Sequence, residues 1–177
     1  MIDERKVKRG TALIADVVNF YGQEPRSLEA TALVLDDLYN TITNAVIPHE
    51  GIVIKWLSDG ALICFWRETH TWDAVQAAVA LQKSFKSFGQ RHGFEQSGLT
   101  ISIATGEMIV GLFGNGPARH YDVFGEPVTC TATIMPEASG AITLCEATHT
   151  EVAQAVEATL LTVHDYFGAL YALKALK

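Results

Sequence analysis

The chain contains 177 residues, of which 49% are hydrophobic and 19% are charged, and its formal net charge is −7. This balance is typical of a compact folded domain and excludes a disordered or fibrous chain. The acidic charge also argues against a basic surface for nucleic acid or anionic membranes, so we expect neither as a partner.

The sequence shows no targeting or membrane-spanning segment. No apolar run approaches the roughly 20 residues that cross a bilayer. The charged first residues are not followed by the apolar stretch of a secretory signal. We therefore expect residues 1–177 to form a single cytoplasmic domain.

The first half of the chain predicts a strand, a helix and a hairpin. The short apolar run 12–18 predicts a buried strand. Apolar residues at helical spacing predict a helix from Ser27, its N-cap, to about residue 47. Two apolar runs, 52–54 and 61–66, flank a polar turn and predict a hairpin.

The second half predicts another helix and several shorter elements. The helix covers about 72–88 with Thr71 as its cap. Residues 99–104 and 108–113 predict a hairpin across Thr105-Gly106-Glu107. The remaining expected elements are a strand at 121–124, a helix from about Pro127, a strand at 141–144 and a short helix at 147–156, and a last pair of apolar runs surrounds Phe167-Gly168.

The leading order β-α-β-β-α-β predicts an α+β fold with a ferredoxin-like βαββαβ core, extended at the C-terminus, with helices mainly on one face of the sheet. In this topology the third strand lies antiparallel beside the first. The end of the first strand, with Asp16, therefore neighbours the Ser58-Asp59-Gly60 turn. We expect Asp16 and Asp59 to meet at one edge of the sheet.

Asp16 is unusual because it interrupts an apolar strand, where a carboxylate needs a partner or must become neutral. Asp59 taken alone is a turn-forming residue. Two neighbouring carboxylates repel each other, and a divalent cation such as Mg²⁺, which prefers oxygen ligands, would relieve both problems. The sequence therefore predicts a metal site at this edge.

Cysteine and histidine residues offer no further metal site. Cys64, Cys130 and Cys145 have no C-x-x-C spacing and lie in apolar or small-residue stretches, so we interpret them as buried reduced thiols. The six histidines lack metal-ligand spacing, and we expect them at the surface or in loops.

Four segments, in order, resemble the motifs of class III adenylate/guanylate cyclases. They correspond to the family's metal-binding strand, its Lys-x-x-Gly-Asp-Gly hairpin, its glycine-marked segment, and its strand-to-helix segment that contacts the base and the transition state. The four are 12–20, 55–60, 105–107 with Gly111 and Gly114, and 121–128. The resemblance runs from about Thr11 to the C-terminus.

The resemblance implies two metal ions, Mg²⁺ or Mn²⁺, in each active site. Asp16 and Asp59 would hold them with help from the carbonyl of Val17. The backbone N–H groups of Asn19, Phe20 and Tyr21, where the family has Gly-Phe-Thr, would cradle the triphosphate.

The resemblance also assigns the purine contacts. Lys55, which taken alone would be interpreted as a solvated lysine, and Asp122 match the pair that reads the base. A lysine donor and an aspartate acceptor suit the N1 and N6 positions of adenine, whereas guanine presents the opposite polarity. This favours ATP over GTP.

Two positions depart from the family pattern. Thr129, seven residues after Asp122, stands where the family has a ribose-orienting Asn, and Thr133 stands where it has a transition-state Arg. A hydroxyl cannot replace a guanidinium, although Arg119 or a partner chain could supply a cation. Lys174 resembles a phosphate-contacting lysine, with a surface lysine as the alternative interpretation.

The resemblance thus implies a nucleotide cyclase that converts ATP to cyclic AMP and pyrophosphate at the interface of a homodimer. Because of Thr129 and Thr133, the alternative is a weak or inactive pseudocyclase that acts as a nucleotide-binding or regulatory module. A third possibility is a heterodimer in which another chain supplies the Asn and Arg.

Overall fold

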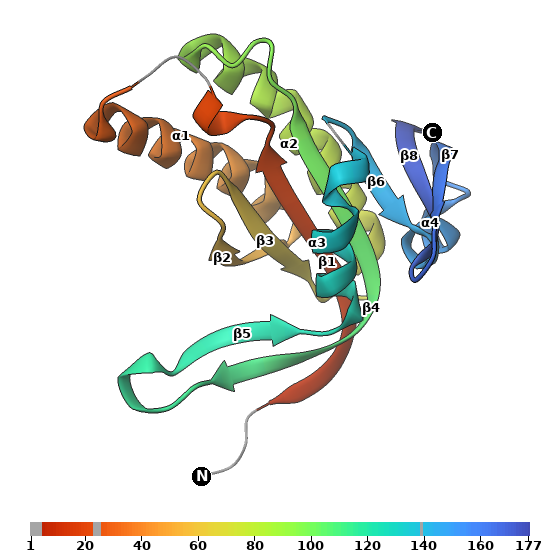
Figure 1. The fold of residues 1–177 in the computed structure, drawn as a ribbon. Helices are drawn as coiled ribbons and strands as arrows, with labels where there is room; N and C mark the ends of the chain where they lie inside the picture. Colours follow the sequence, from red (N-terminus) through yellow and green to blue (C-terminus); the bar gives the residue numbers. More distant parts are fainter. Residues whose placement is uncertain (1–4, 23–25, 139) are drawn as a thin grey trace.

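The apolar residues of the first strand alternate between the two faces of a sheet. β1 (Lys6–Val17) presents Leu13 and Ala15 to one hydrophobic cluster, and Ala12 and Ile14 to another. Because successive side chains of a strand point to opposite faces, both faces must be covered. The computed structural model, which describes residues 5–22, 26–138 and 140–177, shows helices on both sides of the sheet (Figure 1).

The sheet contains the predicted ferredoxin-like core. Its strands run in the order β2-β3-β1-β4, and β1 is antiparallel to both of its neighbours. The α+β prediction is therefore confirmed. The core consists of β1, α1 (Leu28–Val46), β2 (Ile52–Trp56), β3 (Gly60–Phe65), α2 (His70–His92) and β4 (Leu99–Phe113), with the 3₁₀ turns η1 (Phe20–Gly22) and η2 (Ile47–His49).

The C-terminal part extends this sheet beyond β4. The strand next to β4, β6, is parallel to it, and the last hairpin completes the order β6-β8-β7. These elements are η3 (Gly116–Ala118), β5 (His120–Phe124), α3 (Glu126–Ala138), β6 (Ile142–Cys145), α4 (Glu146–Val152), β7 (Val156–His164) and β8 (Gly168–Leu176).

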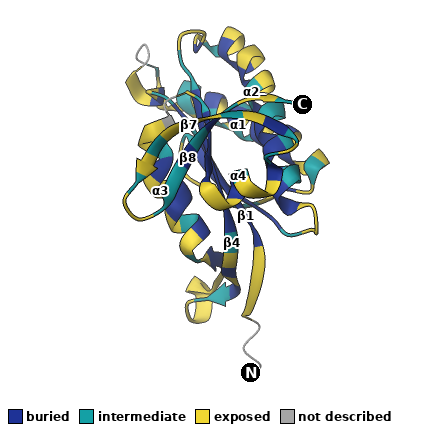
Figure 2. Cartoon of the chain, turned by 90° about the vertical axis from the view of Figure 1, so that its right-hand side faces the viewer, coloured by how far each residue is buried: buried dark blue, intermediate teal, exposed yellow. Residues whose placement is uncertain are grey.

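The helices form two layers. α1 and α2 pack over the cluster that contains Leu13, whereas Val128 and Met135 of α3 pack against the opposite cluster with Ile14. The expectation of helices mainly on one face is confirmed for α1, α2 and α4, whose Val152 joins the cluster with Leu13, whereas α3 covers the other face. Figure 2 shows the buried strands between helices with exposed outer surfaces.

None of the helices in the described part of the chain is long and apolar enough to span a membrane.

The predicted turn at Thr105-Gly106-Glu107 is wrong. β4 runs through it without interruption, and its hairpin partner is β5, which pairs Tyr121 with Leu112. Gly106 serves close packing instead, because a Cβ atom there would lie 2.9 Å from Cγ of Pro127. A glycine needed for helix–strand contact was therefore interpreted as a turn former.

Helix boundaries also differ from the predictions. The N-cap of α1 is confirmed, since Oγ of Ser27 accepts a 3.1 Å hydrogen bond from the Ala30 N–H. By contrast α2 begins at His70, so Thr71 lies inside the helix and is not its cap. α4 ends at Val152 and Val156 already opens β7, which shortens the helix expected at 147–156.

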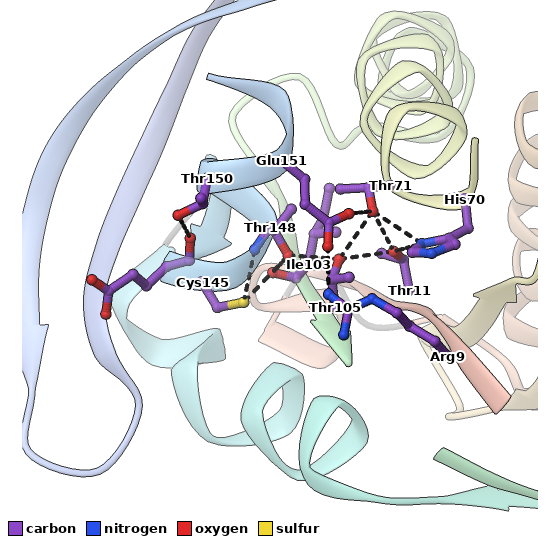
Figure 3. A network of polar contacts seen from close by, with 11 residues as sticks. Arg9, Thr11, His70, Thr71, Ile103, Thr105, Cys145, Thr148, Thr150 and Glu151 are labelled. Carbon is purple, nitrogen blue, oxygen red and sulfur yellow. Dashed lines mark hydrogen bonds and ion pairs between the residues drawn. The ribbon is translucent and has the colours of Figure 1, made fainter. Parts of the chain in front are cut away.

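Thr71 belongs to a buried polar network that the sequence did not reveal (Figure 3). His70 Nδ1 lies 2.8 Å from Oγ1 of Thr11, which in turn lies 2.8 Å from Oγ1 of Thr105. Burial lowers the pKa of His70 below its ordinary value. The expectation that every histidine is exposed is thus wrong for His70, whose ring joins α2 to β1.

The three cysteines are free and buried, as expected.

Candidate active site

The antiparallel pairing of β1 with β3 brings the two acidic residues together. Asp16 lies opposite Gly60 in the register, and the Val17 N–H donates a 3.1 Å hydrogen bond to the carbonyl of Asp59. A Cβ atom on Gly60 would lie 2.2 Å from the carbonyl oxygen of Ala15 and 3.0 Å from Oδ1 of Asp16. Only glycine permits this approach, which sets the turn directly against the Asp16 carboxylate.

Neither carboxylate is electrostatically compensated. Burial, and secondarily the charge of Asp59, raises the pKa of Asp16 to about 6. Burial raises the pKa of Asp59 as well. Within the described part of the chain, no ion pair joins either residue to a lysine, arginine or histidine. Positive charge is therefore what this edge of the sheet lacks.

The donor set fits divalent cations whose coordination is completed by a substrate. Among the described residues no group of three or more acidic, histidine or cysteine side chains could hold a metal ion by itself. Mg²⁺ usually takes one or two carboxylates together with water and substrate phosphates, rather than an all-protein cage. Asp16 and Asp59 meet that requirement.

A short turn follows Asp16 where the triphosphate cradle was predicted. Asn19 adopts a left-handed conformation (φ 56°) and leads into η1. Phe20 is buried and its ring stacks on Phe94 at a centroid distance of 5.2 Å, whereas Tyr21 is exposed. The phenylalanine side chain thus anchors the turn from below and leaves its outer side accessible.

Two tyrosines hold the hairpin that carries Asp59, and sequence reasoning missed this role. Ser58 adopts φ 67°, a left-handed conformation that costs a non-glycine residue about 1 kcal/mol or more. Tyr39 of α1 donates a 2.7 Å hydrogen bond to the Ser58 carbonyl, and the Tyr21 hydroxyl shares a hydrogen bond with Oγ of Ser58. Tyr39 also stacks on Trp56 with a centroid distance of 4.0 Å.

These contacts connect the hairpin to both α1 and the turn at Tyr21. The sequence offered one indication of this role. Ser58 stands where the cyclase motif has glycine, and a non-glycine residue with positive φ needs contacts from other segments to stabilise it. Tyr39 itself carried no signal, because a tyrosine on a helix is ordinary.

The predicted purine-reading pair is formed within the chain. Lys55 Nζ donates a 2.7 Å hydrogen bond to Oδ2 of Asp122, and Oδ1 of Asp122 accepts a 2.8 Å bond from the Val123 N–H. Burial alone would raise the pKa of Asp122, but these hydrogen bonds outweigh it and keep the pKa below its ordinary value. Lys55 is 40% exposed, so its remaining protons can reach a ligand.

The other predicted residues are exposed side chains on α3 and β8. Thr129 and Thr133 are exposed on α3, where the Thr133 hydroxyl donates a 2.8 Å hydrogen bond to the Thr129 carbonyl. Lys174 is exposed on β8, separated from β1 by β4 and β6 in the sheet. The strand register and hydrogen bonds of the described residues join Asp16 with Asp59, and Lys55 with Asp122.

Comparison with known proteins decides the family. A family model described as the adenylate and guanylate cyclase catalytic domain matches residues 3–163. The chain belongs to this family. Its similarity to adenylate cyclase 1 of Rhizobium meliloti (strain 1021) is 23% identity over 133 residues, covering 70% of this chain and 20% of that protein. The aligned part of the cyclase domain thus spans one fifth of that relative's length.

Solved structures show the same fold at low identity. The adenylyl cyclase CyaB from P. aeruginosa superposes with a TM-score of 0.87 at 18% identity, covering 98% of this chain and 97% of that one. The guanylate cyclase domain of RhGC from Catenaria anguillulae, solved in complex with GTP, gives a TM-score of 0.88 at 17% identity, with coverages of 97% and 100%.

The raised pKa of Asp16 makes stability depend on pH in the metal-free cyclase domain. Because the pKa is about 6 in the folded state and about 3.9 in the unfolded state, ionisation disfavours folding as pH rises from about 4 to 6. In the presence of a chelator, we expect Asp16→Asn to stabilise the domain at pH 7 by about 1 kcal/mol after solvent screening, and not at pH 4. Urea unfolding at both pH values measures this.

The exposed Asp36 on α1 supplies the control for this comparison. Asp36→Asn should change the free energy of unfolding by the same small amount at both pH values. A stability difference between Asp16→Asn and the parent that does not change with pH would contradict the explanation.

The tyrosine contacts predict a local loosening. Removing the Tyr39 hydroxyl in Tyr39→Phe should speed amide exchange at Leu57, whose N–H bonds the Gly60 carbonyl at 2.9 Å. A net loss of about 1 kcal/mol corresponds to about fivefold faster exchange. Adding Ser58→Gly should restore protection, because glycine accepts the positive φ without strain. NMR hydrogen exchange gives the rates.

Tyr166, which is 75% exposed, provides a matched Tyr→Phe control that should leave Leu57 exchange unchanged. Equal exchange rates in Tyr39→Phe and the parent would show that the hydroxyl does not hold the hairpin.

Proposed function

We propose that the protein is a nucleotide cyclase that converts ATP to cyclic AMP and pyrophosphate. The observation that carries this proposal is the presence, in a member of this family, of two charge arrangements: the uncompensated carboxylates of Asp16 and Asp59, and the preformed Lys55–Asp122 pair. The first suits metal-bound phosphates and the second suits a purine.

Asp16 and Asp59 would hold two divalent cations, with Val17 contributing its carbonyl oxygen. Such ions, Mg²⁺ or Mn²⁺, activate an attacking oxygen and stabilise the charge of a leaving group. In this reaction the ribose 3′-oxygen attacks the α-phosphorus, and pyrophosphate leaves. The chain's own contribution is to fix the two carboxylates, through the Gly60 contact on one side and the Ser58 contacts on the other.

The base would be read by Lys55 and Asp122. Lys55 would donate a hydrogen bond to N1 of adenine, and Asp122 would accept one from the N6 amino group. The GTP complex of the Catenaria domain supports a purine nucleoside triphosphate as the class of substrate. The polarity of the present pair favours ATP.

The phosphates would lie at the turn after β1. The backbone N–H groups of Asn19, Phe20 and Tyr21 follow Asp16 directly, and successive N–H groups in a tight turn form a concave anion site. Lys174 would add a positive charge from the partner chain. Its place on β8, away from the carboxylates of its own chain, suits that role.

A homodimer would complete the site. Large hydrophobic side chains are exposed around the β2–β3 and β4–β5 hairpins, and apolar patches of this kind mark protein interfaces. They are Trp56, Leu57, Ile109, Tyr121 and Phe124, each 37–50% exposed. Thr129 and Thr133 are also exposed, so they are free to face a second copy.

Thr129 and Thr133 favour a second candidate function, a pseudocyclase that binds nucleotide but turns over slowly. Thr129 could partly replace an Asn that orients the ribose, but Thr133 brings no charge to the transferring phosphorus, and losing a transition-state cation costs about 10³-fold or more in rate. A heterodimeric partner that carries Asn and Arg would remove this deficit.

The direct test is production of cyclic AMP and cyclic GMP from ATP and GTP with Mn²⁺ or Mg²⁺ across protein concentration. We expect cyclic AMP to rise faster than linearly with protein, because the site needs two chains, and to vanish in Asp59→Asn. Asp36→Asn, an exposed aspartate outside the site, should retain activity. Silence at high concentration with nucleotide binding retained would instead establish the pseudocyclase.

Restoring the family residues separates the two candidates. Thr129→Asn combined with Thr133→Arg should raise kcat by about 10³-fold with little change in KM, because the arginine acts on transition-state charge. Ala132→Arg adds an arginine at a neighbouring exposed position of α3 and should give no gain. The measurement is steady-state kinetics of the parent, the double variant and Ala132→Arg. An equal increase in kcat in both variants would contradict a specific role for residue 133.

A further inference from the structure

A cavity of about 290 Å³ has neither Asp16 nor Asp59 in its lining. It is bounded by the middle of β4, the start of α3, α4 and the β7–β8 turn, and its lining includes Thr105, Pro127 and Phe167. On β4 it contacts Ala104 to Glu107, whereas Asp16 pairs with Thr100 at the other end of the strand. The cavity is therefore distinct from the candidate active site.

Two cysteines from different elements meet in the wall of this cavity. Cys130 comes from α3 and Cys145 from the end of β6, and both belong to one buried cluster with Ala104, Ile134 and Leu170. Both side chains line the same cavity, and each thiol is the largest influence on the pKa of the other. They are only 3% and 6% exposed, so the cavity is their route to solvent.

The surroundings make the two thiols unequal. Sγ of Cys145 lies 3.2 Å from Oγ1 of Thr148 and accepts a 3.5 Å hydrogen bond from the Thr148 N–H (Figure 3). The hydrogen bond from Cys130, and then those from Thr148, lower the pKa of Cys145 despite its burial. The same contact raises the pKa of Cys130, helped by burial. Cys145 is thus the nucleophile of the pair, since the thiolate is the reactive form.

We propose that Cys130 and Cys145 form a modification site for low-molecular-weight disulfides. The Cys145 thiolate attacks one sulfur of the reagent, the reagent's S–S bond breaks, and one reagent thiolate leaves and takes up a proton. Cys130 then gives up its proton and attacks the Cys145 sulfur of the mixed disulfide, releasing the second reagent thiol. Two protein thiols are oxidised to one disulfide, and the reagent is reduced to two thiols.

The disulfide would tie α3 to the end of β6. Cys130 sits between Thr129 and Thr133 on α3, so the tie would fix the helix that carries them. This link to turnover rests on the proposed function, whereas the exchange reaction itself does not.

The third cysteine is an internal control. Cys64 is fully buried on β3 in a different cluster, and burial raises its pKa to about 12. It has the same chemistry but is packed in a cluster that contains neither Cys130 nor Cys145. Its reaction with the reagent should be slower than that of Cys145 by at least about 100-fold.

The experiment exposes the folded full chain to oxidised glutathione at neutral pH, quenches with acid, and measures intact mass and cross-linked peptides. We expect the parent to lose two hydrogens and to yield a Cys130–Cys145 linked peptide. Cys130→Ala should instead stop at one glutathionyl group on Cys145, Cys145→Ala should react slowly, and Cys64→Ala should behave as the parent.

The peptide map of the unsubstituted protein decides even if a variant fails to fold. Modification of Cys64 as fast as Cys145, or the absence of a Cys130–Cys145 peptide while the far-UV circular dichroism remains that of the folded chain, would overturn the proposal. None of these readings involves cyclase activity, so an inactive protein would leave this result intact and would count only against the proposed function.

Discussion

The closure of the β2–β3 turn onto β1 is the constraint on which the candidate site depends. Gly60 lies against the Ala15 carbonyl so tightly that any side chain would collide with the backbone. This contact fixes Asp59 beside Asp16, and the Val17–Asp59 backbone hydrogen bond continues it. The strained Ser58 and its two tyrosine partners follow from the same closure, because the chain must reverse within the few residues between β2 and β3.

Local patterns in the sequence predicted most of the fold that positions the site. The cap at Ser27, the β2–β3 hairpin and the apolar runs of β1 and β3 each depend on residues close together in the chain. The proximity of Asp16 and Asp59 followed from topology, since the third strand lies antiparallel beside the first in the usual strand order of a βαββαβ core. Lys55 and Asp122 were singled out only through resemblance to the family, as a purine-reading pair, and the hydrogen bond between them is a finding of the structure.

Contacts between distant segments account for what the sequence did not predict. Gly106 lies within β4, where a side chain would crowd Pro127 of α3, and the interior position of His70 depends on hydroxyl groups from β1 and β4. The support that Tyr39 gives Ser58 likewise joins a helix to a hairpin. Glycine, histidine and tyrosine are common in turns and at surfaces, so their tertiary roles emerge only when the partner segment is in place.

The Lys55–Asp122 pair shapes how a purine would enter. The Lys55 ammonium group already pairs with the Asp122 carboxylate, so the buried carboxylate is not left as an unpaired charge. Under the proposed function, an incoming base has to trade hydrogen bonds with a standing ion pair. Adenine would offer the N1 acceptor to Lys55 and the N6 amino donor to Asp122. A base of opposite polarity would place a donor against the lysine and an acceptor against the aspartate. Base selection would then depend on whether the hydrogen bonds that a nucleotide makes to Lys55 and Asp122 are strong enough to replace the hydrogen bond between these two residues.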